Sequence, residues 1–106
     1  MCSYTAINGV PSCANEYLLQ DILREHYGMG NDGWVVSDCD AVLFVWYPQG
    51  YTTTVVNATA VSLKAGTDID CAVAYTEGLS SALNETLVSV DDIKTSLTRT
   101  YTSLVK

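Results

Sequence analysis

At residues 34–42 the chain has the sequence Trp34-Val35-Val36-Ser37-Asp38-Cys39-Asp40-Ala41-Val42. Its first four residues form a short, largely apolar run with two β-branched valines and no alternation of polar side chains. This pattern is typical of a strand that is buried on both faces, as the strands of parallel sheets are. The stretch therefore predicts a parallel strand at 34–37, with Asp38 and Asp40 after its carboxyl end.

Helices and short strands are expected to alternate on both sides of this strand. Apolar residues recur at helical spacing after Asn15, a favourable N-cap residue, and Ser89 with Asp92 resembles a capping box. Pro48 and Gly50 indicate a loop after the central strand. The expected strands lie at 1–4, 34–37 and 67–70, and the expected helices lie near 16–27, 52–65, 75–86 and 89–104.

This alternation implies right-handed βαβ units around a parallel sheet, and hence an α/β fold. A closed barrel of eight such units takes roughly 250 residues, so three strands do not close one. The chain is therefore either a very small open α/β domain or part of a larger fold. The last helix reaches Lys106 without a C-cap signal, which favours part of a larger fold.

The composition excludes two classes of partner. The 106 residues include 12 Asp and Glu against 5 Lys and Arg, so the formal net charge is −7. Nucleic acids and anionic membrane surfaces both attract Lys and Arg, so neither is expected as a partner. No apolar run approaches the roughly 20 residues that a transmembrane helix needs.

The cysteines and sequons indicate the secretory route. The four cysteines form no CxxC pair and the single histidine is His26, so we expect no metal site and no cofactor. Two disulfides are expected instead, with three possible connectivities. Two Asn-x-Thr sequons predict glycosylation of Asn57 and Asn84 and an extracellular location. Since residues 1–4 lack the features of a signal peptide, we expect the true beginning of the chain to lie upstream.

Polar side chains follow the three expected strands, where functional groups gather in parallel α/β folds. They are Tyr4, Asp38 with Asp40, and Asp68 with Asp70. Asp38 directly follows the clearest strand, and an aspartate is costly to bury there unless it is paired or reactive. A structural role is equally open, in which Asp38 caps a turn after the strand.

Three kinds of chemistry would use such an aspartate, and the spacing alone leaves all three open. As a nucleophile, Asp38 would attack the anomeric carbon of a sugar, with a second carboxyl group about 5 Å away as acid/base. Asp38-Cys39-Asp40 also matches the Asp-x-Asp pattern of a magnesium-dependent phosphatase, whose first aspartate attacks and binds the metal. The four aspartates could instead gather a hard cation.

Several segments in order resemble glycoside hydrolase family 3, and within it the fungal and plant β-xylosidase branch. The segments are Met1-Cys2-Ser3-Tyr4, Asn8-Gly9-Val10-Pro11-Ser12-Cys13, Tyr17-Leu18-Leu19, Ile22-Leu23-Arg24, Val36-Ser37-Asp38-Cys39-Asp40-Ala41-Val42, Gly50-Tyr51 and Leu63-Lys64-Ala65-Gly66-Thr67-Asp68-Ile69-Asp70-Cys71. The tail from Leu83 to Val105 is similar to the helix that closes the first barrel domain of that family. The likeness covers essentially the whole chain.

The resemblance implies a fold and a reaction. Residues 1–106 would be the C-terminal part of the family's N-terminal catalytic domain, an incomplete (β/α)8 barrel made of the last parallel units and the closing helix. Family members release sugars from non-reducing ends with retention of configuration, through a covalent glycosyl-enzyme. The expected substrates are xylan-derived oligosaccharides and aryl β-xylosides.

The resemblance also implies roles for single residues. The nucleophile of the family matches Asp38, and the tyrosine that lines its sugar subsite matches Tyr4. For Asp40, support of the nucleophile loop is favoured over a contact with sugar hydroxyls. Asp68 and Asp70 are expected to stabilise a loop at the mouth of the barrel.

Two disulfides follow from the same resemblance. In the xylosidase branch Cys39 is similar to the partner of Cys71, which leaves Cys2 to pair with Cys13. A crosslink between Cys39 and Cys71 would tie the ends of neighbouring strands around the nucleophile and so support its position.

The chain departs from the family pattern at two places. Thr5 stands where an asparagine is usual, and residues 43–47 are more apolar than usual. Trp46 is expected in a loop, where its ring could stack on a sugar or pack against the protein. The acid/base glutamate and the earlier sugar-binding residues belong to other parts of the family's polypeptide. We therefore expect a fragment that is inactive alone and needs the remainder of the same polypeptide, with a non-catalytic carbohydrate-binding remnant as the alternative.

Overall fold

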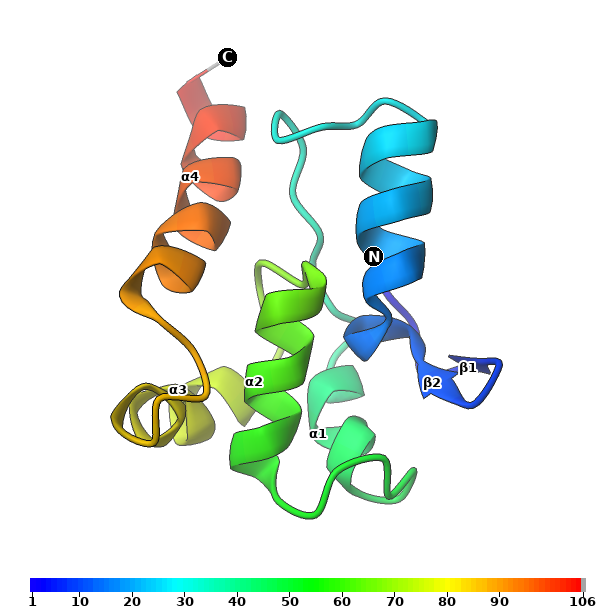
Figure 1. Cartoon of the computed structure of the whole chain (residues 1–106), viewed down its shortest axis with the longest axis vertical. Coiled ribbons are helices and arrows are strands. Elements are labelled where there is room, and N and C mark those ends of the chain that lie inside the picture. The colour runs from blue at the N-terminus through cyan, green and yellow to red at the C-terminus, as the bar shows by residue number, and fades with distance from the viewer. Residues whose placement is uncertain (106) are drawn as a thin grey trace.

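The computed structural model describes residues 1–105, which form a mostly helical α/β unit (Figure 1). The elements are β1 (Ala6–Ile7), β2 (Val10–Pro11), the 3-10 helix η1 (Ser12–Ala14), the π-helix η2 (Tyr17–His26), α1 (Ala41–Trp46), α2 (Val55–Ala65), α3 (Ala74–Asn84) and α4 (Val90–Val105). None of the helices in this described part is long and apolar enough to cross a membrane.

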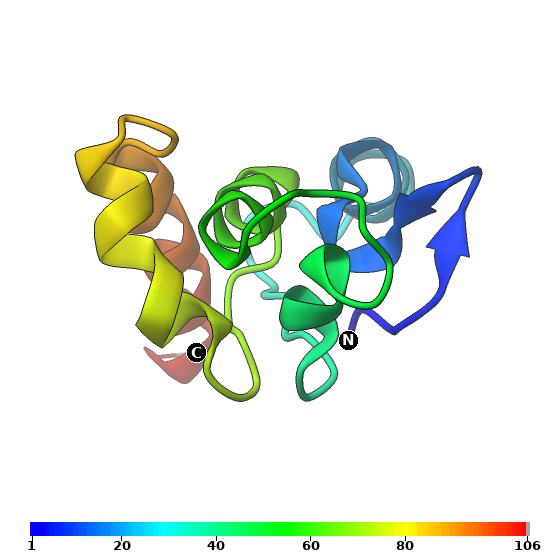
Figure 2. The ribbon, with the colours of Figure 1, turned by 90° about the horizontal axis from the view of Figure 1, so that it is seen from below.

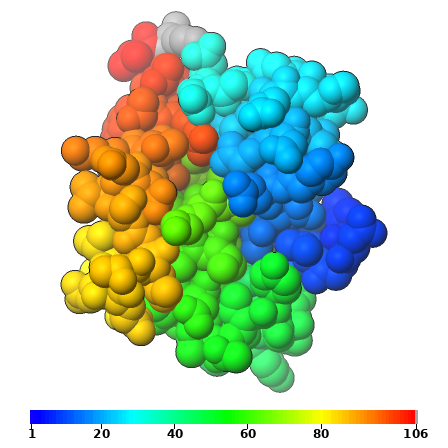
Figure 3. All heavy atoms as spheres, in the orientation of Figure 1, coloured from blue at the N-terminus to red at the C-terminus, as the bar shows by residue number. Residues whose placement is uncertain are grey.

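Helix α2 is the centre of the molecule. It packs against η1, η2, α1, α3 and α4 (Figure 1). On the surface shown in Figure 3, α2 lies between the N-terminal residues and α3, whereas the loop after η2 contacts α4 directly, for example through the hydrogen bond from Arg99 to Asn31. Thr54 caps it by accepting the N–H of Asn57 at 3.1 Å, and Gly66 ends it in the left-handed conformation at φ 117°. Helix α3 approaches closely because Gly78 has no side chain, since a Cβ there would lie 2.5 Å from the Oγ1 of Thr59.

The expected three-stranded parallel sheet is reduced to single bridges. Cys2 pairs with Ser37 and Val36 pairs with Ile69, both in the parallel sense, so segment 34–37 lies between segments 1–4 and 67–70. The regular sheet consists instead of β1 and β2, an antiparallel hairpin whose turn is Asn8-Gly9. Within residues 1–105 the parallel pairing consists of these isolated bridges, and continuous parallel strands are absent.

Most helices lie where the sequence predicts them. The side chain of Asn15 accepts the N–H of Leu18 at 3.0 Å at the start of η2. Before α4, Ser89 and Asp92 form the reciprocal hydrogen bonds of a capping box, at 2.8 and 3.1 Å. The helix near 16–27 differs in kind, because its backbone closes wider π-type turns such as the bond from Tyr27 N–H to Ile22 O.

Helix α1 was not predicted, since a loop was expected over its residues. Its sequence is short and rich in β-branched and aromatic residues, which are weak helix formers. Tertiary burial of Ala41, Val42 and Val45 stabilises it instead. Trp46 therefore ends a helix and does not lie in a loop.

Candidate active site at the carboxyl ends of the extended segments

The bridges bring three polar positions to one end of the molecule. Because Cys2 is level with Ser37, and Val36 with Ile69, the residues that follow these pairs emerge side by side. The N–H of Asp38 donates to the carbonyl of Cys2 at 2.8 Å, which fixes the register next to Tyr4. The chain then runs directly into α1, which lies at this same end (Figures 1 and 2).

Asp38 is half-buried at this end. Its Oδ1 accepts the backbone N–H of Cys39 at 2.9 Å, and its own carbonyl accepts the N–H of Ala41 at 2.9 Å. These bonds restrain the backbone that follows Asp38, and the residue stays partly accessible to solvent. A carboxylate in this state is able to attack an electrophile.

Tyr4 lies beside Asp38. Its hydroxyl donates to the carbonyl of Cys39 at 2.7 Å, and its ring packs against Phe44 with centroids 5.1 Å apart. Desolvation raises the pKa of Tyr4, and the negative charges of Asp38 and Asp40 raise this pKa further. The phenol is therefore protonated at neutral pH and serves as a hydrogen-bond donor.

Both disulfides that the resemblance implies are formed, Cys2–Cys13 and Cys39–Cys71. The second links the residue after Asp38 to the end of the neighbouring extended segment. The first links segment 1–4 to η1.

Asp40 contributes its backbone to this loop. It takes the left-handed conformation at φ 68°, and its N–H donates to the carbonyl of Cys71 at 2.9 Å. Its side chain does not cap α1, although Asp40 directly precedes that helix.

Asp70 lies at the same end and stabilises the loop, in line with its expected role. Its Oδ1 accepts the hydroxyl of Ser37 at 3.2 Å, and its Oδ2 accepts the N–H of Tyr75 at 3.1 Å. The segment after Ile69 is thereby tied both to the central segment and to the start of α3.

The expectation for Asp68 is wrong, because its side chain lies in the interior and not in the loop that follows the extended segment. Its side chain is fully buried between Arg24 and Arg99, with N–O distances of 2.7 and 3.1 Å. Its Oδ2 also accepts the N–H of Val35 at 3.0 Å. Asp68 precedes the bridge at Ile69, so its side chain enters the core at the amino end of the segment.

Several of these contacts were not predicted from the sequence. Phe44 and Gln49 both contact Tyr4, the latter through a hydrogen bond from its amide to the Tyr4 carbonyl. Arg24 and Arg99 are buried partners of an aspartate. Both arginines lie on the side of their helix opposite its apolar residues, so helical periodicity gives no signal for their burial.

The remaining predicted positions lie elsewhere. Asn57 is half-buried in the first turn of α2, whereas Asn84 is exposed at the end of α3. His26 is exposed at the end of η2 against the ring of Tyr27. Within residues 1–105 no group of three or more His, Cys, Asp and Glu side chains could hold a metal ion.

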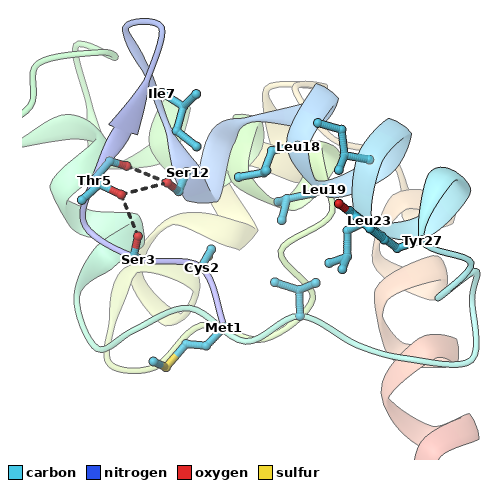
Figure 4. Close-up of a pocket in the computed structure, with 12 residues that line it drawn as sticks. Met1, Cys2, Ser3, Thr5, Ile7, Ser12, Leu18, Leu19, Leu23 and Tyr27 are labelled. Carbon is cyan, nitrogen blue, oxygen red and sulfur yellow. Dashed lines mark hydrogen bonds between the residues drawn. The ribbon is translucent and has the colours of Figure 1, made fainter.

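An apolar hollow of about 390 Å³ lies next to the site, on the other side of segment 1–4. Figure 4 shows Met1 and Cys2 on one wall and Leu18, Leu19 and Leu23 of η2 on the other. Neither Tyr4 nor Asp38 lines it. The hollow is therefore distinct from the cluster around the carboxylate.

The chain matches a known protein family over nearly its whole length. The glycosyl hydrolase family 3 N terminal domain matches residues 1–103, so the chain belongs to glycosyl hydrolase family 3. It is 47% identical to the exo-1,4-beta-xylosidase xlnD of Emericella nidulans over 106 residues, which are 100% of this chain and 13% of that protein.

Solved structures agree with this assignment. A GH3 exo-beta-xylosidase, XlnD, in complex with a xylobiose aziridine activity-based probe is 48% identical, with a TM-score of 0.96 over 99% of this chain and 14% of that one. A beta-glucosidase from Listeria innocua is 27% identical, with a TM-score of 0.80 over 90% of this chain and 13% of that one. The chain thus spans about one seventh of the length of these relatives.

Proposed function

We propose that these residues are part of the catalytic barrel of a retaining, exo-acting β-xylosidase, in which Asp38 is the nucleophile. The observation that carries the proposal is a half-buried carboxylate at the carboxyl end of a parallel segment, beside a protonated tyrosine. The 47% identity to an exo-1,4-beta-xylosidase over the whole chain supports xylo-oligosaccharides as substrates. Membership of a glycosidase family favours this chemistry over a phosphatase.

In the proposed reaction the Asp38 carboxylate attacks the anomeric carbon of a terminal β-xylosyl residue. The bond from this carbon to the leaving oxygen breaks, and a second carboxyl group, about 5 Å away, protonates that oxygen. Water then attacks the anomeric carbon from the face that the leaving group left and gives a proton to the second carboxyl group, now ionised. The bond to Asp38 breaks, which releases xylose with its original configuration and regenerates the Asp38 carboxylate. Tyr4 would donate a hydrogen bond within the sugar subsite once its hydroxyl leaves the Cys39 carbonyl.

The acid/base group is assigned to another part of the same polypeptide, and so are most of the sugar contacts. In the proposed barrel, residues 1–106 supply the last β/α units and the closing helix, and the hollow beside segment 1–4 receives the preceding unit. General acid–base catalysis alone contributes about 10²–10⁴-fold, so the chain alone is expected to be inactive.

An extracellular location fits the same proposal. Both disulfides are formed, and disulfides persist in oxidising compartments. Asn84 is exposed and therefore accessible for glycosylation, and we keep Asn57 as a second site.

Labelling with a 2-fluoro-xyloside inactivator tests the proposal. The protein purified from its natural source is treated with the inactivator, and its intact mass and labelled peptide are determined. We expect a species several times heavier than 11.5 kDa that carries one label, on the peptide containing Asp38.

Two controls complete this experiment. The isolated 106-residue chain, incubated with an aryl β-xyloside, should show no turnover. A label on another residue would overturn the role of Asp38. A natural product of 11.5 kDa that binds xylo-oligosaccharides without being labelled would favour a non-catalytic remnant instead.

A further inference from the structure

Cys71 holds the residues on both sides of Asp38 with three different groups. Its N–H donates to the side-chain oxygen of Ser37 at 2.9 Å, and its carbonyl accepts the N–H of Asp40 at 2.9 Å. Its sulfur is bonded to Cys39. Cys71 thus restrains the chain before and after Asp38, in addition to the hydrogen bond from the Asp38 N–H to the Cys2 carbonyl.

On the amino side of Asp38 the backbone is restrained through the side chain of Ser37. This side chain is buried, with the residue 1% exposed, and its hydroxyl accepts from Cys71 while it donates to the carboxylate of Asp70 at 3.2 Å. The other oxygen of Asp70 accepts the N–H of Tyr75 in the first turn of α3. A continuous chain of hydrogen bonds therefore joins the residue before Asp38 to a helix.

The backbone around this chain is strained at two positions. Asp40 and Ala72 each have left-handed conformations, at φ 68° and 112°, and each directly follows one of the two cysteines. Such residues cost about 1–3 kcal/mol each and persist only where the surroundings impose them. The disulfide fixes these two turns, whereas Ser37 and Asp70 fix the segment that precedes them.

We propose that Ser37 and Asp70 are positioning residues for the nucleophile, which hold the Asp38 carboxylate in line with the anomeric carbon while the disulfide holds the turn behind it. This inference rests on the proposed function, and it adds that the disulfide by itself does not position the Asp38 carboxylate. The disulfide acts on Cys39, after the nucleophile, whereas Ser37 and Asp70 restrain the residue before it. A misplacement of about 1 Å costs on the order of 10²-fold in rate.

The test compares Ser37→Ala with Asp70→Asn in the natural gene product that contains these residues. For each variant we measure kcat and KM on an aryl β-xyloside and the rate constant of labelling by the 2-fluoro-xyloside. We expect Ser37→Ala to lower kcat and the labelling rate together by about 10–100-fold, with KM within about threefold. Asp70→Asn should lower both by a smaller factor, because the amide keeps one acceptor for Ser37.

Ser62→Ala is the matched control. Ser62 is also a buried serine, but within the described residues its hydroxyl has no hydrogen-bond partner, so its removal should leave the labelling rate unchanged. If Ser37→Ala does not fold, the test rests on Asp70→Asn alone. This variant is expected to fold, because Asp70 is partly exposed and the change keeps the size of the side chain.

The outcomes separate this inference from the proposed function. Absence of a label on Asp38 in the unmodified protein would overturn the proposed function. Labelling of the unmodified protein, together with unchanged labelling rates in both variants, would overturn the inference alone. An equal slowing by Ser62→Ala would also overturn it, because the effect would then be one of general packing.

Discussion

Asp38 and Asp68 are carboxylates on neighbouring parallel segments, but at opposite ends. Asp38 is half-buried at the carboxyl end and accepts a backbone N–H from the next residue. Asp68 lies at the amino end with its side chain fully buried, and its two oxygens bind Arg24 and Arg99. One aspartate remains accessible, whereas the other is enclosed by cations.

The difference shows how placement decides the use of a carboxylate. Removal of one partner from a buried ion pair leaves an uncompensated charge, so Asp68 is committed to stability. Within residues 1–105 the half-buried Asp38 has no ion-pair partner to lose, and its surroundings restrain the backbone. Mutations at the two sites should therefore affect different properties.

The largest effect is expected from Asp38→Ala. In the proposed enzyme this change removes the nucleophile, so kcat should fall by about 10⁴–10⁶-fold, as when other covalent nucleophiles are removed. The thermal midpoint should change little, because Asp38 is half-exposed. Hydrolysis of an aryl β-xyloside measures the first quantity and thermal unfolding the second. A loss of less than tenfold would contradict the role of Asp38.

Asp68→Asn should give the opposite result. It keeps the volume of the side chain but leaves Arg24 and Arg99 without a buried counter-charge, which costs about 3–5 kcal/mol in the free energy of unfolding. Denaturant unfolding measures this loss. The exposed Asp21→Asn is the control and should stay within about 0.5 kcal/mol. A variant as stable as this control would show that the ion pairs are dispensable.

Tyr4→Phe sharpens the comparison at the accessible end. The change removes the hydroxyl that donates to the Cys39 carbonyl beside Asp38 but keeps the ring against Phe44. One lost hydrogen bond of about 1.4 kcal/mol corresponds to a tenfold lower kcat/KM on an aryl β-xyloside. The exposed Tyr101→Phe should have no effect. Equal activity of both variants would exclude a role of the Tyr4 hydroxyl.

The smallest effect is expected on stability at alkaline pH, through Tyr75. Its hydroxyl donates to the carbonyl of Thr67, the residue before Asp68. Desolvation raises the pKa of Tyr75 well above its usual value of 10.0, and Asp70 and Asp68 raise it further. The folded state thus favours the neutral phenol, whose contribution to stability is complete below about pH 10 and is lost as the pH rises toward the higher folded pKa.

Thermal unfolding between pH 8 and 11 tests this for Tyr75→Phe. The variant lacks the hydrogen bond to the Thr67 carbonyl, 2.5 Å in the parent, so it should be less stable by about 1 kcal/mol at pH 8. Since phenylalanine does not ionise, the gap to the parent should narrow above pH 10. A constant gap would show that Tyr75 does not titrate within the transition.

The starts of two helices and the placement of Asp38 could be predicted from the sequence. Local chemistry specifies caps, so Asn15, Ser89 and Asp92 identified the starts of two helices. The apolar run before Asp38 was enough to place this residue at the carboxyl end of an extended segment. Those signals depend only on neighbours in the chain, which is why they can be read without a structure.

The sequence by itself therefore determined the order of the segments, the cysteines available for pairing and the aspartates beside the extended segments. Only the tertiary structure decided that Asp68 points into the core while Asp70 braces the loop, although the two are separated by one residue. It also decided that α1 is helical against weak local propensity. The physical reason is common to these cases: burial, ion pairing and the register of parallel segments join residues that are far apart in the chain.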